Sequence, residues 1–139
     1  MMTQKKPAHT FPTTRQPAIR RVMMPRDTNS LGTIFGGIIL AEIDLAAATE
    51  AHRYHPRKIV TVAMDQIEFK QPVFVGDLVS FFADCTRVGS TSITVHVEVW
   101  AQRATDRSKK AYVTEASVTM VAVGDDFKPT PIERRKPLG

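Results

Sequence analysis

Cysteine is almost absent from this chain of 139 residues, and the single Cys85 excludes an intrachain disulfide. A chain without disulfides fits a reducing compartment, so we expect a cytoplasmic protein. The run around the cysteine, LVSFFADC, has the pattern of a strand. We therefore expect Cys85 to be a core thiol rather than a nucleophile.

Long hydrophobic runs are also absent. No window reaches the roughly 18 apolar residues of a membrane span, and the charged N-terminus is not followed by the apolar core of a secretory signal. The four histidines, His9, His52, His55 and His96, lack the spacing of a metal site such as HExxH, and a structural zinc site would need more cysteines. We expect no membrane span and no metal.

Acidic residues are missing from residues 1–21, where five basic residues lie: Lys5, Lys6, Arg15, Arg20 and Arg21. This segment carries the whole formal charge of +5, because 14 basic residues balance 14 acidic ones from Val22 onward. The aromatic residues fall singly or in apolar runs, not interleaved with Lys and Arg. We expect no nucleic-acid partner, whereas a small phosphate-bearing ligand is compatible with this pattern.

Length and composition predict one domain with a modest core, since 42% of the residues are hydrophobic. Residues 1–17, rich in Pro, Thr and Lys, are expected to form a flexible basic tail. Residues 18–124 form the domain, and residues 125–139 form a C-terminal extension that we expect to fray over residues 133–139.

The pattern of apolar residues predicts one long helix and five strands. The helix is expected over residues 36–53, and the strands over residues 18–24, 59–70, 77–87, 92–103 and 111–123. In the strand at 92–103 the side chains alternate, with Ile93, Val95, Val97 and Val99 on one face. A helix apolar on most sides must be covered, so we expect an α+β fold in which a curved antiparallel sheet of about five strands wraps a central helix. The half-covered helix and an exposed edge strand predict pairing of two sheets across a dimer.

Asp44 interrupts the most apolar part of the predicted helix. At helical spacing it shares a face with Leu40, Ala41, Ala47 and Ala48. A carboxylate taken out of water needs a hydrogen-bonding or charged partner, and enzymes use such groups as general bases or nucleophiles. The alternative is a structural or solvated acid.

Gly36 and Gly37 open the same helix, where first-turn N–H groups have no partner within the helix. Such a helix start attracts anions or a developing oxyanion. Gly37 and Asp44 are about 10 Å apart along the helix at 1.5 Å per residue, which is too far for one small reacting group. Either the substrate lies along the helix, or Asp44 meets a helix start from a second subunit. The alternative for both glycines is a tight turn with close packing.

These stretches resemble the hotdog-fold acyl-CoA thioester hydrolases, especially the YciA-like branch and the domains of cytosolic acyl-CoA hydrolases. The resemblance covers about residues 20–123 and rests on MPRDTNSLGTIFGGIILAEID, VTVAMDQIEFKQPVFVGD, VGSTSITVHVEVW and YVTEASVTMVAV. It implies a hotdog fold and a homo-oligomer, with a dimer as the minimal unit and a trimer of dimers as the assembly. It also implies hydrolysis of fatty acyl-CoA to free fatty acid and coenzyme A. No cofactor is implied, because coenzyme A is part of the substrate and product.

The resemblance also assigns roles to residues. Asp44 matches the helix acid that serves as general base or nucleophile, and Asn29 matches the loop residue that joins it from another subunit. Gly36 and Gly37 match the glycines before the helix, and the N–H of Gly37 would polarise the thioester carbonyl. The turn along the coenzyme A moiety is matched by Val88, Gly89, Ser90, Thr91 and Ser92, with Arg87 as a phosphate contact.

The sequence departs from the family pattern at one place, and two other functions are alternatives to thioester hydrolysis. Relatives often have Gly-Gly soon after the helix acid, where this chain has Leu45, Ala46 and Ala47, so we expect a different acyl chain-length preference. A non-catalytic acyl-CoA-binding hotdog module is the alternative function, although it would not need Asp44 and Asn29. A hotdog dehydratase would need a histidine with the helix acid, and residues 10–51 contain none.

Overall fold

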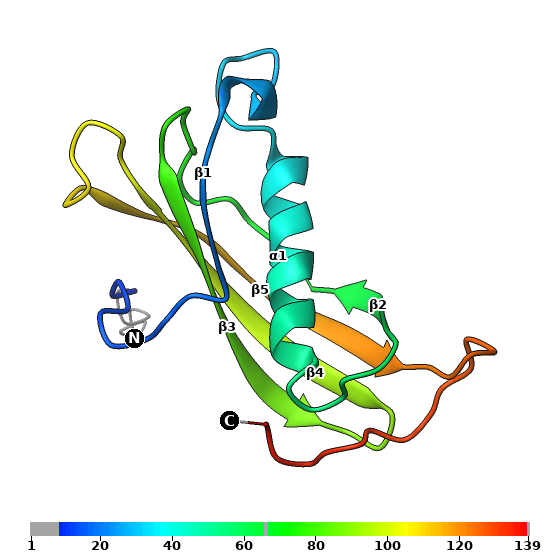
Figure 1. Ribbon diagram of the computed structural model, residues 1–139. Coiled ribbons are helices and arrows are strands. Elements are labelled where there is room, and N and C mark those ends of the chain that lie inside the picture. The colour runs from blue at the N-terminus through cyan, green and yellow to red at the C-terminus, as the bar shows by residue number, and fades with distance from the viewer. Residues whose placement is uncertain (1–8, 66, 139) are drawn as a thin grey trace, which may run out of the picture.

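Five antiparallel strands form one sheet in the order β1-β3-β4-β5-β2, and a single α-helix lies against it (Figure 1). The computed structural model describes residues 9–65 and 67–138. The elements are β1 (Ile19–Val22), the 3-10 helix η1 (Pro25–Asp27), α1 (Gly36–Ala51), β2 (Ile59–Met64), β3 (Leu78–Val88), β4 (Ser92–Gln102) and β5 (Lys110–Ala122). The predicted fold class is confirmed.

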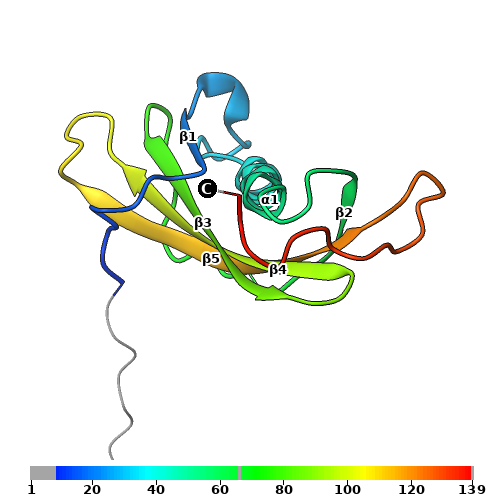
Figure 2. The same ribbon diagram turned by 60° about the horizontal axis from the view of Figure 1, so that its bottom comes forward.

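Helix α1 lies in the concave face of the curved sheet (Figure 2). Its buried side chains face β3, β4 and β5: Ile39, Ile43, Ala46, Ala47 and Ala51. The three alanines let the helix approach the sheet closely, while Leu45 remains 55% exposed on another face. One subunit therefore covers the helix on only part of its circumference.

The alternation predicted for residues 92–103 is confirmed in β4. Ile93, Val95, Val97 and Val99 are fully buried under α1. Their neighbours Thr94, His96 and Glu98 lie on the outer face and are partly exposed. The inner face of the sheet therefore supplies most of the core.

Three predicted elements are longer than the observed ones by at least two residues, and the first is the strand expected over residues 18–24, which is β1. β2 ends at Met64, and beyond it only scattered backbone bonds join the chain to β5, such as Lys70 N–H to Val113 O at 2.7 Å. Helix α1 ends at Ala51, where the His52 N–H bonds to Ala48 O and the chain turns toward Pro56. Within residues 9–65 and 67–138, no helix is both long enough and apolar enough to cross a membrane.

Residues 9–17, the described part of the expected flexible tail, lie against the outer face of the sheet. His9 stacks on Tyr112 with ring centroids 3.7 Å apart, and Phe11 packs edge-on against Phe82 and Trp100 at 5.8 and 5.6 Å. Arg15 forms an ion pair with Asp84. Residues 1–8 of the expected tail lie outside the described residues.

Residues 130–138, which we call the C-terminal strap, run back across the molecule instead of fraying. The N–H of Ile132 donates to Ser90 O at 2.8 Å, joining the strap to the β3–β4 turn. The N–H of Leu138 donates to Arg53 O at 2.9 Å, joining it to the end of α1. These bonds pair strap backbone that a frayed terminus would leave to water.

Candidate active site

Helix α1 carries three acidic side chains, and two of them have a basic partner. Glu42 lies 3.1 Å from Arg21, and Glu50 lies 2.8 Å from Arg53. Asp44 forms no ion pair with any described residue, although its side chain is half-buried. It is thus the acid of α1 whose charge is not already engaged by a cation.

Thr61 on β2 holds the Asp44 carboxylate. Its hydroxyl donates to Oδ1 of Asp44 at 2.6 Å, a short hydrogen bond of the kind made to charged oxygens. The second oxygen, Oδ2, accepts no hydrogen bond from the part of the chain that the structure describes. One oxygen is fixed and the other is open to a water or substrate. The sequence reasoning missed Thr61, because nothing in an alternating strand marks one threonine as the partner of a helix acid.

The start of α1 carries the two predicted glycines between two exposed aromatic rings. The ring of Phe35 covers Gly37 so closely that a Cβ there would collide with it, and a Cβ on Gly36 would lie 3.4 Å from Phe69. Phe35 and Phe69 are 55% and 46% exposed. No acceptor for the N–H of Gly36 or Gly37 is found among the described residues. The helix start therefore offers two free donors in an apolar setting.

Asn29 organises its own loop in this structure. Its Oδ1 accepts the N–H groups of Leu31 and Thr33 at 2.9 and 3.2 Å, and its Nδ2 donates to Thr33 Oγ1 at 2.9 Å. This loop lies near the start of α1, whereas Asp44 lies two turns further on. No described hydrogen bond joins Asn29 to Asp44, so one subunit does not bring these two predicted residues into contact.

Asp27 fixes the loop that leads to the helix, a role that the sequence reasoning did not assign. Its carboxylate accepts the Met24 N–H at 2.8 Å and pairs with Arg21 at 2.8 Å, and Arg21 in turn pairs with Glu42 on α1. The Met24 hydrogen bond and the Arg21 charge lower the pKa of Asp27 below its usual 3.8, despite burial. The network ties residues 24–27 to the side of α1.

The predicted coenzyme A turn, residues 88–92, connects β3 to β4. Its carbonyls are used internally: Gly89 O accepts from Arg135, and Thr91 O accepts from the Ala122 N–H. The hydroxyls of Ser90 and Thr91 and the guanidinium of Arg87 have no hydrogen-bond partner among residues 9–65 and 67–138. These groups are the ones of the turn that remain available to a ligand.

The register of the sheet shows how far this turn lies from Thr61, the residue that holds Asp44. Ser92 pairs with Val121, and Val121 pairs with Val60, the neighbour of Thr61. Strands lie about 4.8 Å apart, so Ser92 and Val60 are about 10 Å apart across β5. The predicted turn and the predicted catalytic acid therefore belong to the same region of the subunit.

In the described part of the chain, no three His, Cys, Asp or Glu side chains are grouped as metal ligands.

The curved sheet around a central helix assigns the protein to the hotdog class, in which thioesterases are found. The chain belongs to the thioesterase superfamily, whose sequence profile matches residues 31–106. The match includes α1 with Asp44 and the turn at residues 88–92.

The proteins most similar to this chain in sequence and structure include thioesterases of the same family. The chain is 37% identical over 116 residues to the acyl-CoA thioester hydrolase YciA of Salmonella typhimurium, covering 82% of this chain and 87% of the relative. A hexameric hotdog-fold thioesterase of Campylobacter jejuni has a TM-score of 0.81 and 45% identity, over 88% of this chain and 93% of that one. A hexameric broad-specificity acyl-coenzyme A thioesterase, solved as an aspartate-to-alanine mutant, has a TM-score of 0.80 and 34% identity over 87% and 88%. The predicted relationship to acyl-CoA thioester hydrolases is confirmed.

Proposed function

We propose that this protein hydrolyses acyl-CoA thioesters to coenzyme A and the free acid, with Asp44 as the catalytic carboxylate. The proposal rests mainly on the hydrogen bonding of the Asp44 carboxylate. Thr61 holds one of its oxygens, and the other has no described partner. The relatives support the reaction, since the chain shares 37% identity with an acyl-CoA thioester hydrolase over most of its length.

The chemistry needs only a base or nucleophile and an oxyanion site, because a thioester is already activated. As a base, Asp44 takes a proton from water, whose oxygen bonds to the carbonyl carbon. The C–S bond then breaks, and the coenzyme A thiolate leaves and takes up the proton that Asp44 removed from water. As a nucleophile, the carboxylate attacks the carbonyl carbon, the C–S bond breaks with loss of the coenzyme A thiolate, and water hydrolyses the resulting anhydride to the free acid and the Asp44 carboxylate. In both routes the N–H of Gly37 stabilises the negative charge on the carbonyl oxygen.

The catalytic groups are proposed to come from two subunits of a homo-oligomer. Asn29 and the helix start lie apart from Asp44 within one chain, so a second copy must present them if they act together. Leu45 on α1 and Val62 on β2 are 55% and 56% exposed, and β2 is an edge strand, as expected for a face that pairs with another copy. The hexameric neighbours support a homo-oligomer, and we propose a dimer as its unit and a trimer of dimers as its assembly.

Substrate contacts are assigned from the groups that remain free. Arg87 and the hydroxyls of residues 90–92 are proposed to contact the coenzyme A moiety, and the exposed rings of Phe35 and Phe69 are proposed to line the acyl site. Ala46 and Ala47 face the sheet and Leu45 does not. Of Leu45, Ala46 and Ala47, Leu45 is therefore the one that is proposed to alter chain-length preference.

Release of free thiol from acyl-CoA substrates of increasing chain length tests the proposal. We expect Asp44→Asn to lower turnover by about 100-fold or more, because general-base catalysis contributes about that much. Glu50→Gln is the matched control, since it removes an acid of the same helix that is already paired with Arg53. Wild-type turnover by Asp44→Asn would overturn the catalytic role of Asp44. If the wild type binds acyl-CoA but releases no thiol, the protein is a binding module.

A further inference from the structure

His55 lies in the loop between α1 and β2, and only 3% of its surface is exposed. Its Nδ1 lies 3.2 Å from the backbone nitrogen of Glu133 in the C-terminal strap. A backbone N–H can only donate, so Nδ1 must be the acceptor, and the proton of the neutral ring must be on Nε2. Burial lowers the pKa of His55, which keeps the ring neutral near pH 7.

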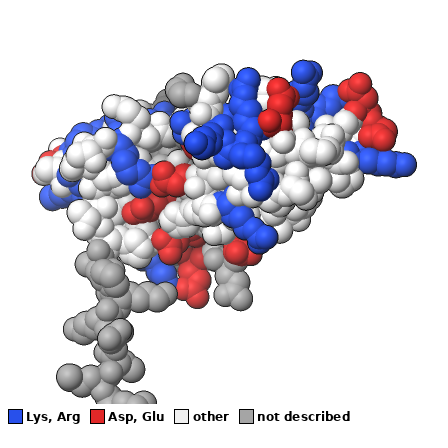
Figure 3. Space-filling view, turned by 90° about the horizontal axis from the view of Figure 1, so that it is seen from below, with Lys and Arg blue, Asp and Glu red and all other residues white. Residues whose placement is uncertain are grey.

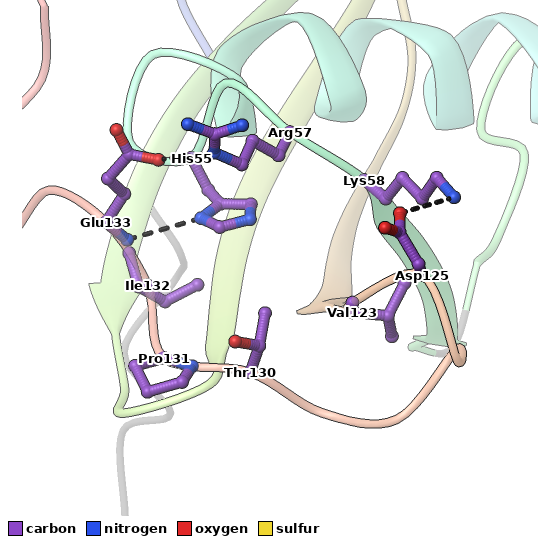
Figure 4. Close-up of a pocket in the computed structure, with 10 residues that line it drawn as sticks. His55, Arg57, Lys58, Val123, Asp125, Thr130, Pro131, Ile132 and Glu133 are labelled. Carbon is purple, nitrogen blue, oxygen red and sulfur yellow. Dashed lines mark hydrogen bonds and ion pairs between the residues drawn. The ribbon is translucent and has the colours of Figure 1, made fainter.

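The Nε2–H of His55 has no hydrogen-bond partner among the described residues, although it is fully buried. A buried donor without a partner costs about 1–3 kcal/mol, so such groups are rare. Figure 4 shows one ring nitrogen directed at Glu133 and the other on the side where the pocket lies. A ligand that brings an acceptor oxygen against this wall of the pocket, with a small shift of the lining side chains, would satisfy the donor.

The pocket has a volume of about 580 Å³, which is in the range of small-ligand sites. Two parts of the chain that lie far apart in the sequence form it: the loop with His55, and the stretch that runs from the end of β5 into the strap. Beside His55 it is lined by Arg57, Lys58, Val123, Gly124, Asp125, Thr130, Pro131, Ile132 and Glu133. The lining therefore depends on the strap that follows the sheet.

Two cations lie at the rim of the pocket, in ion pairs that can open. Arg57 lies 3.2 Å from Glu133, and Lys58 lies 3.2 Å from Asp125. The side chains of Arg57, Lys58 and Asp125 are 75%, 52% and 101% exposed, and such surface pairs contribute little to stability. A doubly charged anion would compete for both cations at small cost.

The surroundings of the pocket are basic. Residues 50–58 and 125–138 together carry seven basic and four acidic side chains. Figure 3 looks at this end of the molecule and shows Lys and Arg spread across it. This charge favours an anionic ligand over a neutral one with the same acceptor.

We propose that the pocket binds a phosphoryl group, with the Nε2–H of His55 donating to a phosphate oxygen and Arg57 and Lys58 supplying positive charge. The phosphoryl group has two chemical sources, the nucleotide end of coenzyme A or a free nucleotide. The first source rests on the proposed function, since it makes the pocket part of substrate recognition. The second does not, and would make the pocket a separate nucleotide site.

Calorimetric titration with coenzyme A, dephospho-coenzyme A and ADP tests the proposal on the full-length protein. His55→Asn is the first variant, because the asparagine oxygen can still accept the Glu133 N–H while no donor remains at the Nε2 position. Lys58→Gln is the second variant, and its exposed position leaves the core untouched. Lys109→Gln is the matched control, with the same loss of charge in the turn between β4 and β5 at the opposite end of the molecule. Hydrogen exchange at the Ile132 and Glu133 amides checks that the strap stays in place.

We expect both pocket variants to raise the Kd of a phosphate-bearing probe about tenfold, with Lys109→Gln unchanged. If the effect appears with coenzyme A and is lost with dephospho-coenzyme A, the source is the 3′-phosphate of the substrate. If it appears with ADP alone, the source is a free nucleotide. Equal affinities of the wild type and Lys58→Gln for every probe, or no binding of any probe by the wild type, would overturn the proposal and leave His55 to a buried water. All these outcomes are read from binding, so a failure of thioester hydrolysis remains distinguishable from them.

Discussion

The hydroxyl of Thr61 occupies Oδ1 of Asp44, so under the proposed function it is Oδ2 that acts on the substrate. We expect Thr61→Val to lower kcat about tenfold, since a hydrogen bond to a charged group is worth about 1.5–3 kcal/mol. KM should change little if Thr61 positions the carboxylate and does not bind substrate. Steady-state kinetics with one acyl-CoA measures both parameters.

Thr61→Ser is the control for this prediction, because it keeps the hydroxyl and removes only a methyl group. We expect it to restore most of the lost kcat. Equal losses in the serine and valine variants would mean that the methyl contact, and not the hydrogen bond, is what matters.

Asp27 predicts an acid dependence of stability. Its pKa is lower in the folded protein than its usual 3.8, chiefly through the Met24 N–H and Arg21. A carboxyl with a lowered folded pKa contributes stability that is present above the unfolded pKa and is lost as the pH falls through the folded value. We expect Asp27→Asn to cost about 2 kcal/mol at pH 7 and less below pH 3.8. Urea unfolding at pH 7, 5 and 3 measures this.

The exposed Asp65 provides the comparison for Asp27. Asp65→Asn should leave the free energy of unfolding nearly unchanged at pH 7, because its side chain is exposed and makes no described hydrogen bond or ion pair. A constant difference between Asp27→Asn and the wild type from pH 7 to 3 would contradict the linkage.

The role of a single residue could be predicted where that residue differs in chemical character from the residues around it in the sequence. Asp44 is conspicuous because apolar residues surround it in a helix, and Gly36 and Gly37 because they open that helix. Thr61 and Asp27 carry no such contrast, since a threonine is ordinary in a strand and an aspartate is ordinary in a loop. Their roles arise from partners on other elements, which sequence spacing does not encode.

Among the elements, the segment of residues 9–17 yields a prediction about the outer face of the sheet. Phe11 packs on Trp100, which is the only tryptophan of the chain. We expect Phe11→Ala to cost about 1–2 kcal/mol, because the ring is only half-buried, and to shift Trp100 emission to longer wavelength. Fluorescence-detected urea unfolding measures both effects.

Phe127→Ala is the matched control for Phe11→Ala, since the Phe127 side chain is 68% exposed in the loop after β5. It should change stability by less than about 0.5 kcal/mol. Unchanged Trp100 emission in Phe11→Ala would mean that the segment does not shield the sheet in solution.

Strong periodicity predicted α1 and β4 well, because in both elements local pattern and tertiary burial agree. For the two terminal segments, the local pattern and the tertiary contacts do not agree. Their Pro, Thr and charged residues indicate disorder by composition, whereas the structure holds residues 9–17 by aromatic contacts and residues 130–138 by backbone bonds to turns. Such contacts join residues that are roughly 40 to 110 positions apart in the sequence, so a pattern read over a short window cannot predict them.

At the scale of the whole molecule, the exposed face of α1 predicts self-association. We expect Leu45→Glu to reduce the molar mass measured by light scattering after size exclusion, because burying an unpaired charge in an apolar contact is costly. Leu138→Glu is the matched control, since Leu138 is 62% exposed but lies on the strap and not on α1. A monomeric wild type, or an unchanged mass for Leu45→Glu, would contradict the two-subunit site.

The strand order has a consequence for synthesis on the ribosome. β1 and β2 occupy opposite edges of the sheet, and their partners are β3 and β5. About 70 residues separate the end of α1 from the end of β5, which at 5–20 residues per second is a delay of about 4–14 s. During that time the apolar helix α1 has no complete sheet to cover it. Truncated translation products that stop before Lys110 should therefore be the forms of this protein most dependent on chaperones and most prone to aggregate.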